Sequence, residues 1–340
     1  MSNPSAGNKD RGAPIKSTAI ESESDEGAAA RSGLAKVFWT GEDARMRAGW
    51  RILIAALVLF GVLIGTNQGI SALGLSGPAG RIIGHLPFFL ATAAMLYAAS
   101  RLDQRQVGDY GFAMGGQWWG DFAGGIALGV LMHGGVAAAH FGLGWAQTAG
   151  TFEMGAFGGP FALAMGIVLL QFAGVALWEE ALFRGVFILN TAEGLSGWDV
   201  SLRTRVFGAW LVPTVVFGGL HALSAGGEGV ALSAVVGQAI LAGAYFGLPY
   251  VLTGNLALPL GLHLATNFAD TALFGGTAPR FENFPAVLRM STDFPGGWET
   301  VGGLGMPAQV VTMGLVLLWI HWTRGSLEIA PRLRRAAGWP

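Results

Sequence analysis

Long apolar runs are the feature that most constrains how this chain can fold. The hydrocarbon core of a bilayer is ~30 Å thick, so a helix needs about 20 apolar residues to cross it. Eight segments of the sequence approach that length, at residues 50–73, 82–100, 119–143, 160–190, 206–223, 229–252, 255–275 and 301–323. The sequence therefore predicts an all-α fold, a polytopic membrane helix bundle with about eight transmembrane helices.

The composition agrees with a bilayer as the solvent. Charged residues make up 12% of the chain, whereas soluble domains carry about 25%. The 55 glycines and 12 tryptophans are residue types frequent within membrane helices and at membrane interfaces. A net charge of −1 argues against a nucleic-acid partner, which requires a basic face. Because the sequence has no cysteine, disulfides and a cysteine nucleophile are excluded.

Basic residues predict the orientation of the bundle. Loops rich in Lys and Arg stay in the cytoplasm. Basic residues precede the first and fifth apolar runs and follow the second and eighth; they are Arg45, Arg47, Arg51, Arg203, Arg205, Arg101, Arg105, Arg324, Arg332, Arg334 and Arg335. This pattern predicts that both ends of the bundle are cytoplasmic, N-in and C-in. The loop at 276–300 is an exception, and its two arginines are balanced by acidic residues.

The chain is expected to divide into three parts. Residues 1–40 are rich in Ser, Ala, Gly and charge, and such segments bury too little apolar surface to fold, so they are predicted to form a disordered cytoplasmic tail without a cleavable signal peptide. Residues 45–325 are predicted to form the transmembrane domain, with a motif core at 165–275. Residues 326–340 are predicted to form a second cytoplasmic tail.

Three charged side chains lie within six residues of the fourth apolar run. They are Glu179, Glu180 and Arg184, and each charge placed at the bilayer centre costs about 2.5–3.5 kcal/mol. Glu180 and Arg184 are four residues apart, share a helix face and can pair. Glu179 is rotated from them by about 100°. It therefore needs a polar neighbour from another helix.

Two other apolar runs offer such neighbours. One ends in Phe217-Gly218-Gly219-Leu220-His221, where the glycines allow close helix approach. The other contains His263-Leu264-Ala265-Thr266-Asn267, with both polar side chains on one face. If the three helices converge, a buried carboxylate can take a proton from water and an imidazole can orient that water. A second imidazole and the amide can then donate to a developing oxyanion.

Taken in order, Glu-Glu-x-x-x-Arg, Phe-x-x-x-His and His-x-x-x-Asn on successive apolar helices resemble the CPBP family. That family contains the type 2 CAAX prenyl proteases and bacterial bacteriocin-processing and immunity proteins. The resemblance covers roughly residues 165–275. It implies Glu179 as the water-activating residue, His221 as its partner, His263 and Asn267 as the oxyanion site, and Glu180 and Arg184 as the support of the first glutamate. It also implies a bacterial cytoplasmic membrane protein.

No cofactor follows with certainty from the sequence. Glu179, His221 and His263 could together bind zinc and leave an open position for water. The alternative is a glutamate that acts as the base without a metal. Asn267 favours the alternative, because an amide suits hydrogen bonding better than zinc ligation.

The predicted function is that of an intramembrane endopeptidase whose partners are the lipid bilayer and a membrane-anchored peptide or protein. Two alternatives stay open. The buried Glu and His residues could form the relay of a proton-coupled transporter, or the protein could bind a peptide without cutting it, as an immunity protein does. Other protease classes are disfavoured: Gly-Leu-Ser-Gly occurs at 74–77 and 194–197, in predicted loops, and no His-Glu-x-x-His zinc motif is present.

Overall fold

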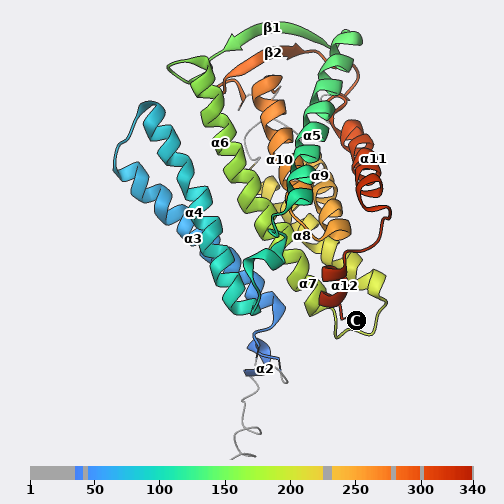
Figure 1. Cartoon of the computed structure of the whole chain (residues 1–340). Helices are drawn as coiled ribbons and strands as arrows, with labels where there is room; N and C mark the ends of the chain where they lie inside the picture. Colours follow the sequence, from blue (N-terminus) through green and yellow to red (C-terminus); the bar gives the residue numbers. More distant parts are fainter. Residues whose placement is uncertain (1–34, 41–44, 225–231, 277–280, 299–301, 339–340) are drawn as a thin grey trace, which may run out of the picture. The chain divides into compact units, whose positions relative to one another are not determined.

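The computed structural model describes residues 35–40, 45–224, 232–276, 281–298 and 302–338. Most of the described residues are helical, and one two-stranded sheet accompanies the helices (Figure 1). The prediction of an all-α helix bundle is confirmed. The chain divides into a first unit that ends at Arg47 and a second that begins at Ala48. Most of the tail predicted at 1–40 lies outside the described residues; within them, Ala35–Phe38 forms the short helix α2.

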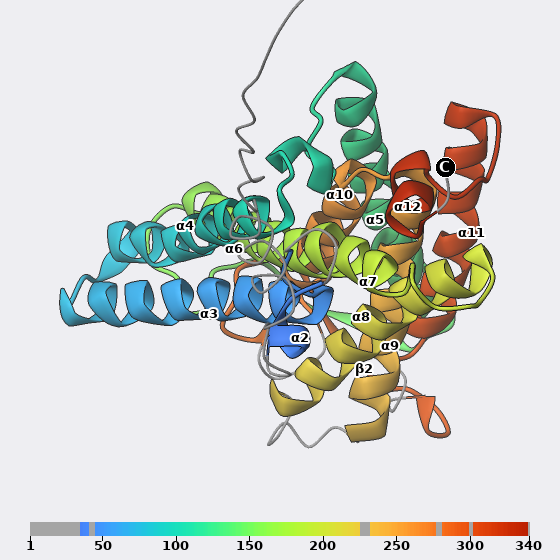
Figure 2. The same cartoon turned by 90° about the horizontal axis from the view of Figure 1, so that it is seen from below.

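Six helices in the described part of the chain are long and apolar enough to cross a membrane. They are α3 (Ala48–Ala72), α4 (Gly77–Asp103), α5 (Gly116–Gly142), the continuous helix Phe161–Gly194, the segment Val236–Thr253 of α9 (Leu232–Thr253), and α11 (Gly305–Arg324). The protein is thus an integral multi-pass membrane protein. Figure 2 shows α3 and α4 as a hairpin beside α6.

Two of the eight predicted spans do not meet the criterion for a membrane-spanning helix. They correspond to α8 (Leu202–Ser224) and α10 (Ala257–Phe268). Helix α8 begins beside Arg203 and contains Pro213. Helix α10 has 12 residues and continues into the five residues of the π-helix η3 (Ala269–Leu273), so the continuous helix is shorter than the about 20 residues that a span usually needs. The two helices that fall short are those that carry His221, His263 and Asn267.

The continuous helix Phe161–Gly194 changes its winding immediately after the two glutamates. It consists of α6 (Phe161–Glu180), the π-helix η2 (Ala181–Ile188) and α7 (Leu189–Gly194). Every residue from Ala181 to Val186 is buried, so neighbouring helices enclose this turn on all sides. Long π-helical segments are rare, and shorter ones are frequent at functional sites.

Glycines bring α5 and α10 into close contact. A Cβ atom added to Gly125 would lie 2.5 Å from the backbone oxygen of Leu258, and one added to Gly129 would lie 2.7 Å from the Cβ of Ala265. Gly261 on α10 approaches the backbone of α5 in the same way. Small residues that let backbones approach are typical of packed membrane helices. This contact fixes the rotation of α10 and therefore the direction of His263.

The turn before α10 is also held in place. Gly254 has φ +68°, a conformation that glycine adopts without strain. The side-chain oxygen of Asn255 accepts a hydrogen bond of 3.1 Å from the backbone N–H of Ala257, at the start of α10. The Asn255 amide donates to Asp121 of α5 at 3.3 Å, and Arg324 of α11 pairs with the same aspartate. These contacts join the start of α10 to α5 and α11.

The two-stranded sheet joins distant loops. Strand β1 (Ala146–Glu153) pairs antiparallel with β2 (Ala286–Thr292), and an ion pair between Arg289 and Glu153 supports the pairing. Both loops must therefore lie at the same end of the bundle, as the alternating topology predicts. Figure 1 shows the sheet at one end and α12 (Pro331–Ala336) at the other.

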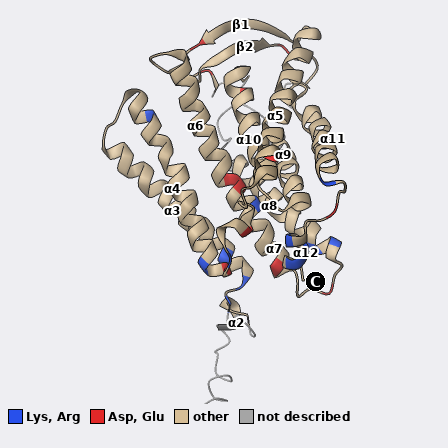
Figure 3. Ribbon diagram, viewed as in Figure 1, with Lys and Arg blue, Asp and Glu red and all other residues tan. Residues whose placement is uncertain are grey.

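Basic residues gather at the end of the bundle opposite the sheet (Figure 3). At this end Asp103 is fully buried and binds four groups from other elements. Arg51 lies 3.0 Å from it, the Tyr110 hydroxyl donates at 2.7 Å, and the Asn190 amide donates at 2.8 Å; Arg105 lies 3.7 Å away. The network joins α3, α4, α7 and the 3₁₀ helix η1 (Val107–Tyr110). Burial, reinforced by the Asp103 carboxylate, raises the pKa of Tyr110 well above its usual range.

The segment predicted as a tail at 326–340 is partly helical. Within the described residues, Leu333 of α12 is buried, as are Ala330 and Ala337 on either side of the helix. Helix α12 contacts α7 and α8, and Arg205 of α8 donates to the Ala337 carbonyl at 2.9 Å. The basic end of the chain is therefore held against the bundle.

Candidate active site

Glu180 is the most tightly bound of the predicted site residues. It is fully buried, and its Oε1 lies 3.0 Å from Arg184 Nη1 and 2.7 Å from His263 Nδ1. The pair with Arg184 is the one that the i, i+4 spacing predicts. An ionised carboxylate only accepts hydrogen bonds, so Nδ1 of His263 carries the proton. Glu180 thus connects α6 to α10.

Arg184 is enclosed by its own set of partners. Its side chain is 2% exposed, and Nη2 donates to the Gly243 carbonyl of α9 at 3.2 Å. The guanidinium carbon lies 4.8 Å from the Phe217 ring centre and 5.5 Å from that of Phe246. Aromatic faces and a carboxylate both stabilise a buried guanidinium, although Nη1 of Arg184 has the ion pair with Glu180 and no hydrogen bond among the described residues. The charge is therefore part of the packed interior.

Glu179 has a different environment from its neighbour. Its side chain is 10% exposed, and Oε2 lies 3.7 Å from His263 Nε2. In the described part of the chain this buried oxygen has no hydrogen-bond partner. The separation exceeds a direct hydrogen bond and leaves the oxygen available to a water molecule that also contacts the imidazole.

His263 lies between the two glutamates. Its ring stacks on Phe246 of α9, with centroids 4.4 Å apart and planes at 11°. The side chain is 4% exposed. Because Nδ1 is bound by Glu180, Nε2 points toward Glu179. The contacts with α6 and α9 thus fix both the orientation and the tautomer of this imidazole.

His221 stands on α8, close to Phe217 of the same helix. Its Nδ1 lies 2.9 Å from the Phe217 carbonyl oxygen, and the two rings are 4.4 Å apart. A carbonyl only accepts, so this contact places the lone pair of the neutral imidazole on Nε2. His221 also interacts electrostatically with Glu179. Phe217 therefore covers Arg184 and orients His221, which gives the Phe-x-x-x-His spacing a physical reason.

Asn267 lies one turn beyond His263 on α10, and its side chain is half-buried. Its position on the same face follows from the i, i+4 spacing. No hydrogen bond joins it to the other five site residues within the ranges that the structure describes. The structure thus brings together Glu179, Glu180, Arg184, His263 and His221, and leaves Asn267 adjacent to them.

The side chains do not form a three-ligand metal site. Across the described ranges, no three side chains of His, Cys, Asp or Glu type have the spacing that a metal ion requires. Nδ1 of His263 is bound to Glu180, and Nδ1 of His221 to a backbone carbonyl. The set considered from the sequence, Glu179, His221 and His263, does not fit a zinc centre in this arrangement.

Helix α9 contributes contacts that the sequence analysis did not assign. Gly243 accepts from Arg184 and Phe246 stacks on His263. In the sequence, the spacing of Gly243 and Gly247, one helix turn apart, could have indicated that this face of α9 packs closely against another helix. A Cβ added to Gly243 would lie 3.2 Å from the Thr214 oxygen, and one added to Gly247 would lie 2.9 Å from the Trp210 ring. Such small-x-x-x-small spacing predicts a close helix seam, here with α8.

Comparisons with known proteins give one match. Residues 160–269 match the family model described as type II CAAX prenyl endopeptidase Rce1-like, whereas no curated protein and no solved structure matches the chain. The matched segment extends from Pro160, just before α6, into the π-helix η3 (Ala269–Leu273), and it contains all six predicted site residues. The resemblance to the CPBP intramembrane proteases is thus confirmed: residues 160–269 of this chain carry the Rce1-like, type II CAAX prenyl endopeptidase family region.

Proposed function

We propose that this protein is a CAAX-protease-like intramembrane endopeptidase in which Glu179 activates the attacking water. The observation that carries the proposal is the contrast between the two adjacent glutamates. Glu180 is fully buried and its Oε1 is bound by Arg184 and His263, whereas the Glu179 side chain is 10% exposed and its Oε2 faces the Nε2 atom of His263. Among the described residues, the Oε2 atoms of both glutamates lack a hydrogen-bond partner. Of the two carboxylates, Glu179 is the one that is partly exposed and has no ion pair with the arginine, so we assign to it the proton taken from water.

In the proposed reaction Glu179 takes a proton from a water molecule, which attacks the carbonyl carbon of the scissile peptide bond. His221 orients this water through Nε2. The negative charge that develops on the carbonyl oxygen is stabilised by the Asn267 amide and by the His263 imidazole, which Glu180 holds in place. Glu179 then passes its proton to the leaving amine, and the bond breaks to give a free carboxylate and a free amine.

The proposed substrate is a peptide or protein held at the membrane by its own anchor. The family description supports a C-terminal processing reaction of the CAAX type. The position of the site on a membrane-spanning helix agrees with a substrate delivered from the bilayer. The proposed chemistry is that of a glutamic protease, because the described side chains do not assemble metal ligands.

The proposal is tested by Glu179→Gln in the full-length protein reconstituted into liposomes with a membrane-anchored peptide. Loss of a general base lowers the rate by roughly 10²–10⁴-fold, so peptide products should fall at least to the lower end of that range. The matched control is Glu328→Gln, which removes the same charge from an exposed position outside the bundle core. Both variants should insert and unfold like the original protein.

The same experiment separates the alternatives. Full cleavage by Glu179→Gln would overturn the proposed role of this carboxylate. Solute or proton flux without peptide products would identify a transporter. Peptide binding without cleavage, unchanged by Glu179→Gln, would identify a binding protein of the immunity type.

A further inference from the structure

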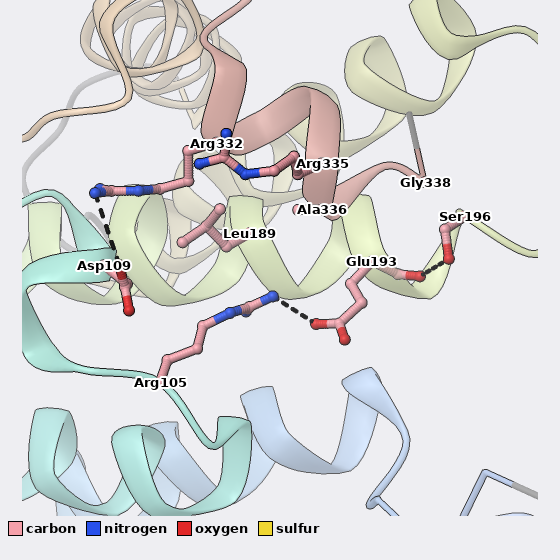
Figure 4. A pocket seen from close by; sticks show the side chains of 9 residues that line it. All are labelled: Arg105, Asp109, Leu189, Glu193, Ser196, Arg332, Arg335, Ala336 and Gly338. Carbon is pink, nitrogen blue, oxygen red and sulfur yellow. Dashed lines mark hydrogen bonds and ion pairs between the residues drawn. The ribbon is translucent and has the colours of Figure 1, made fainter. Parts of the chain in front are cut away.

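A cavity of about 410 Å³ lies at the end of the bundle opposite the sheet, away from the paired glutamates. Residues of α7, of η1 and its preceding loop, and of α12 line it (Figure 4). Five of the lining residues are charged: Arg105, Arg332, Arg335, Asp109 and Glu193. Figure 4 shows Arg332 and Arg335 on one side and Arg105 and Glu193 on the other.

The depth of this cavity can be inferred from the ends of the membrane spans. Span α4 ends at Asp103 and the continuous helix ends at Gly194. The lining residues Arg105 and Ser196 follow directly after these ends. Helix α12 begins shortly after the span that ends at Arg324. The cavity therefore lies where the hydrocarbon core gives way to the headgroup region.

The two acidic residues that line the cavity already interact with other groups of the protein. Glu193 lies 3.2 Å from buried Arg51 and 3.0 Å from Arg105. Asp109 accepts the backbone N–H of Gln106 at 3.0 Å and lies 3.9 Å from Arg332. Their charges are thus engaged by groups of the protein itself.

Arg335 supplies the uncompensated charge. Its side chain is exposed, and in the described part of the chain its guanidinium has neither an ion pair nor a hydrogen bond. Arg332 beside it is held only loosely by Asp109, at 3.9 Å, and donates from Nη1 to the Gly254 carbonyl at 2.9 Å. The cavity therefore carries a net positive charge, with donors of α12 turned toward it.

The charged groups of the cavity and its depth in the membrane together indicate which class of ligand it binds. Guanidinium groups bind phosphate oxygens through paired hydrogen bonds, and basic pockets between membrane helices at the cytoplasmic side bind anionic lipid headgroups. A substrate C-terminus that is cut beside Glu179 does not reach this pocket. Glu193 lies roughly 15–20 Å along the helix from Glu180, whereas the three residues that follow the cysteine of a CAAX tail span only about 10 Å when extended. We propose that this pocket binds the phosphate of an anionic phospholipid headgroup. The inference does not rest on the proposed proteolytic function.

The test uses the full-length protein in nanodiscs of neutral phosphatidylcholine, with or without phosphatidylglycerol. Lipid retention is measured by native mass spectrometry and stability by thermal unfolding. Phosphatidylglycerol should be retained and should raise the unfolding temperature. Arg335→Gln should weaken lipid retention roughly tenfold, as expected for the loss of a charge-assisted contact. The matched control, Arg334→Gln, makes the same charge change on the same helix outside the cavity and should retain lipid normally.

Three results would overturn the proposal. An equal decrease in lipid retention in Arg334→Gln and Arg335→Gln would show that the lipid is attracted to the basic surface in general and not bound in the pocket. The same stabilisation by inorganic phosphate in neutral nanodiscs would assign the site to a free phosphate. If phosphatidylglycerol is not retained and does not change the unfolding temperature, an anionic phospholipid is excluded as the ligand. Unchanged unfolding of Arg335→Gln in neutral nanodiscs serves as the check that the variant is folded.

Discussion

Adjacent residues on one helix turn, Glu179 and Glu180, both lie beside His263, but only Glu180 also pairs with Arg184. The spacing of Glu180 and Arg184 allowed their pairing to be predicted, because residues four apart on a helix share a face. The bond between Glu180 and His263 could not be predicted. It depends on the rotation of α10 about its axis, which the glycine contacts with α5 fix in three dimensions. Motif spacing identifies which residues meet, but it does not assign each imidazole to a carboxylate.

Arg184 is expected to be required for stability as well as for the arrangement of the site. Arg184→Met leaves Glu180 buried beside a single partner, and removal of one member of a buried ion pair costs about 3–5 kcal/mol. Arg184→Lys should recover only part of the loss, because an ammonium group lacks the planar fork that reaches Glu180 and the Gly243 carbonyl together. Unfolding in detergent measures both changes.

The control for this prediction is Arg101→Met, which removes an exposed arginine near the end of α4. It should change the free energy of unfolding by no more than about 0.5 kcal/mol. A similarly small change in Arg184→Met would show that Glu180 does not depend on this guanidinium.

Metal chelators are expected to leave peptide cleavage unchanged. The described side chains do not assemble three metal ligands, and one nitrogen of each site imidazole is bound within the protein. Cleavage is measured before and after treatment with EDTA and again after addition of zinc. Loss of activity that zinc restores would contradict the glutamic mechanism and favour a metal-bound water.

At the scale of elements, the contact between α5 and α10 is the one that places His263. Gly125→Ala introduces a Cβ only 2.5 Å from a backbone oxygen of α10, so the helices must separate. Overpacking of this kind costs about 1–3 kcal/mol, and cleavage should fall with stability because His263 moves. Unfolding and cleavage are measured on the same preparations.

Gly120→Ala is the matched change on the same helix, since a Cβ there meets nothing within 4 Å. It should leave cleavage unchanged. If Gly120→Ala and Gly125→Ala had the same stability and the same cleavage rate, the close approach of the two backbones at Gly125 would not be needed for either. The comparison separates helix packing from the general effect of replacing glycine in a helix.

The network around Asp103 predicts a pH-dependent difference in stability. Tyr110 has a raised pKa in the folded protein because burial and the Asp103 carboxylate disfavour its ionised form. The hydroxyl therefore stabilises the fold at pH values below the ordinary pKa of tyrosine, 10.0, and this contribution declines as the pH rises further and the unfolded chain ionises.

Tyr110→Phe should lower the free energy of unfolding by roughly 1–3 kcal/mol at neutral pH, as expected for a hydrogen bond to a charged group. The difference from the original protein should shrink above about pH 10. Denaturant unfolding across this range provides the measurement. A difference that grows with pH would reverse the assigned direction of the pKa change.

At the scale of the whole molecule, hydropathy predicted helices in all eight regions and the alternation of loops between the two ends. The sheet could not be predicted, because β1 and β2 are separated by more than a hundred residues and β1 contains small and polar residues without a strand pattern. Six of the eight predicted regions meet the criteria for a membrane-spanning helix within the described residues; α10 is too short, and α8, although 23 residues long, is not among the six.

The shortness of α10 and the composition of α8 bear on how the protein is made. Insertion of a helix into lipid depends on its own length and hydropathy, and neither of these helices has both the length and the hydropathy of the six candidate spans. Both must be accommodated by partners that are already in the bilayer. We therefore expect the helices that carry His221, His263 and Asn267 to take their places after the longer spans have entered the bilayer.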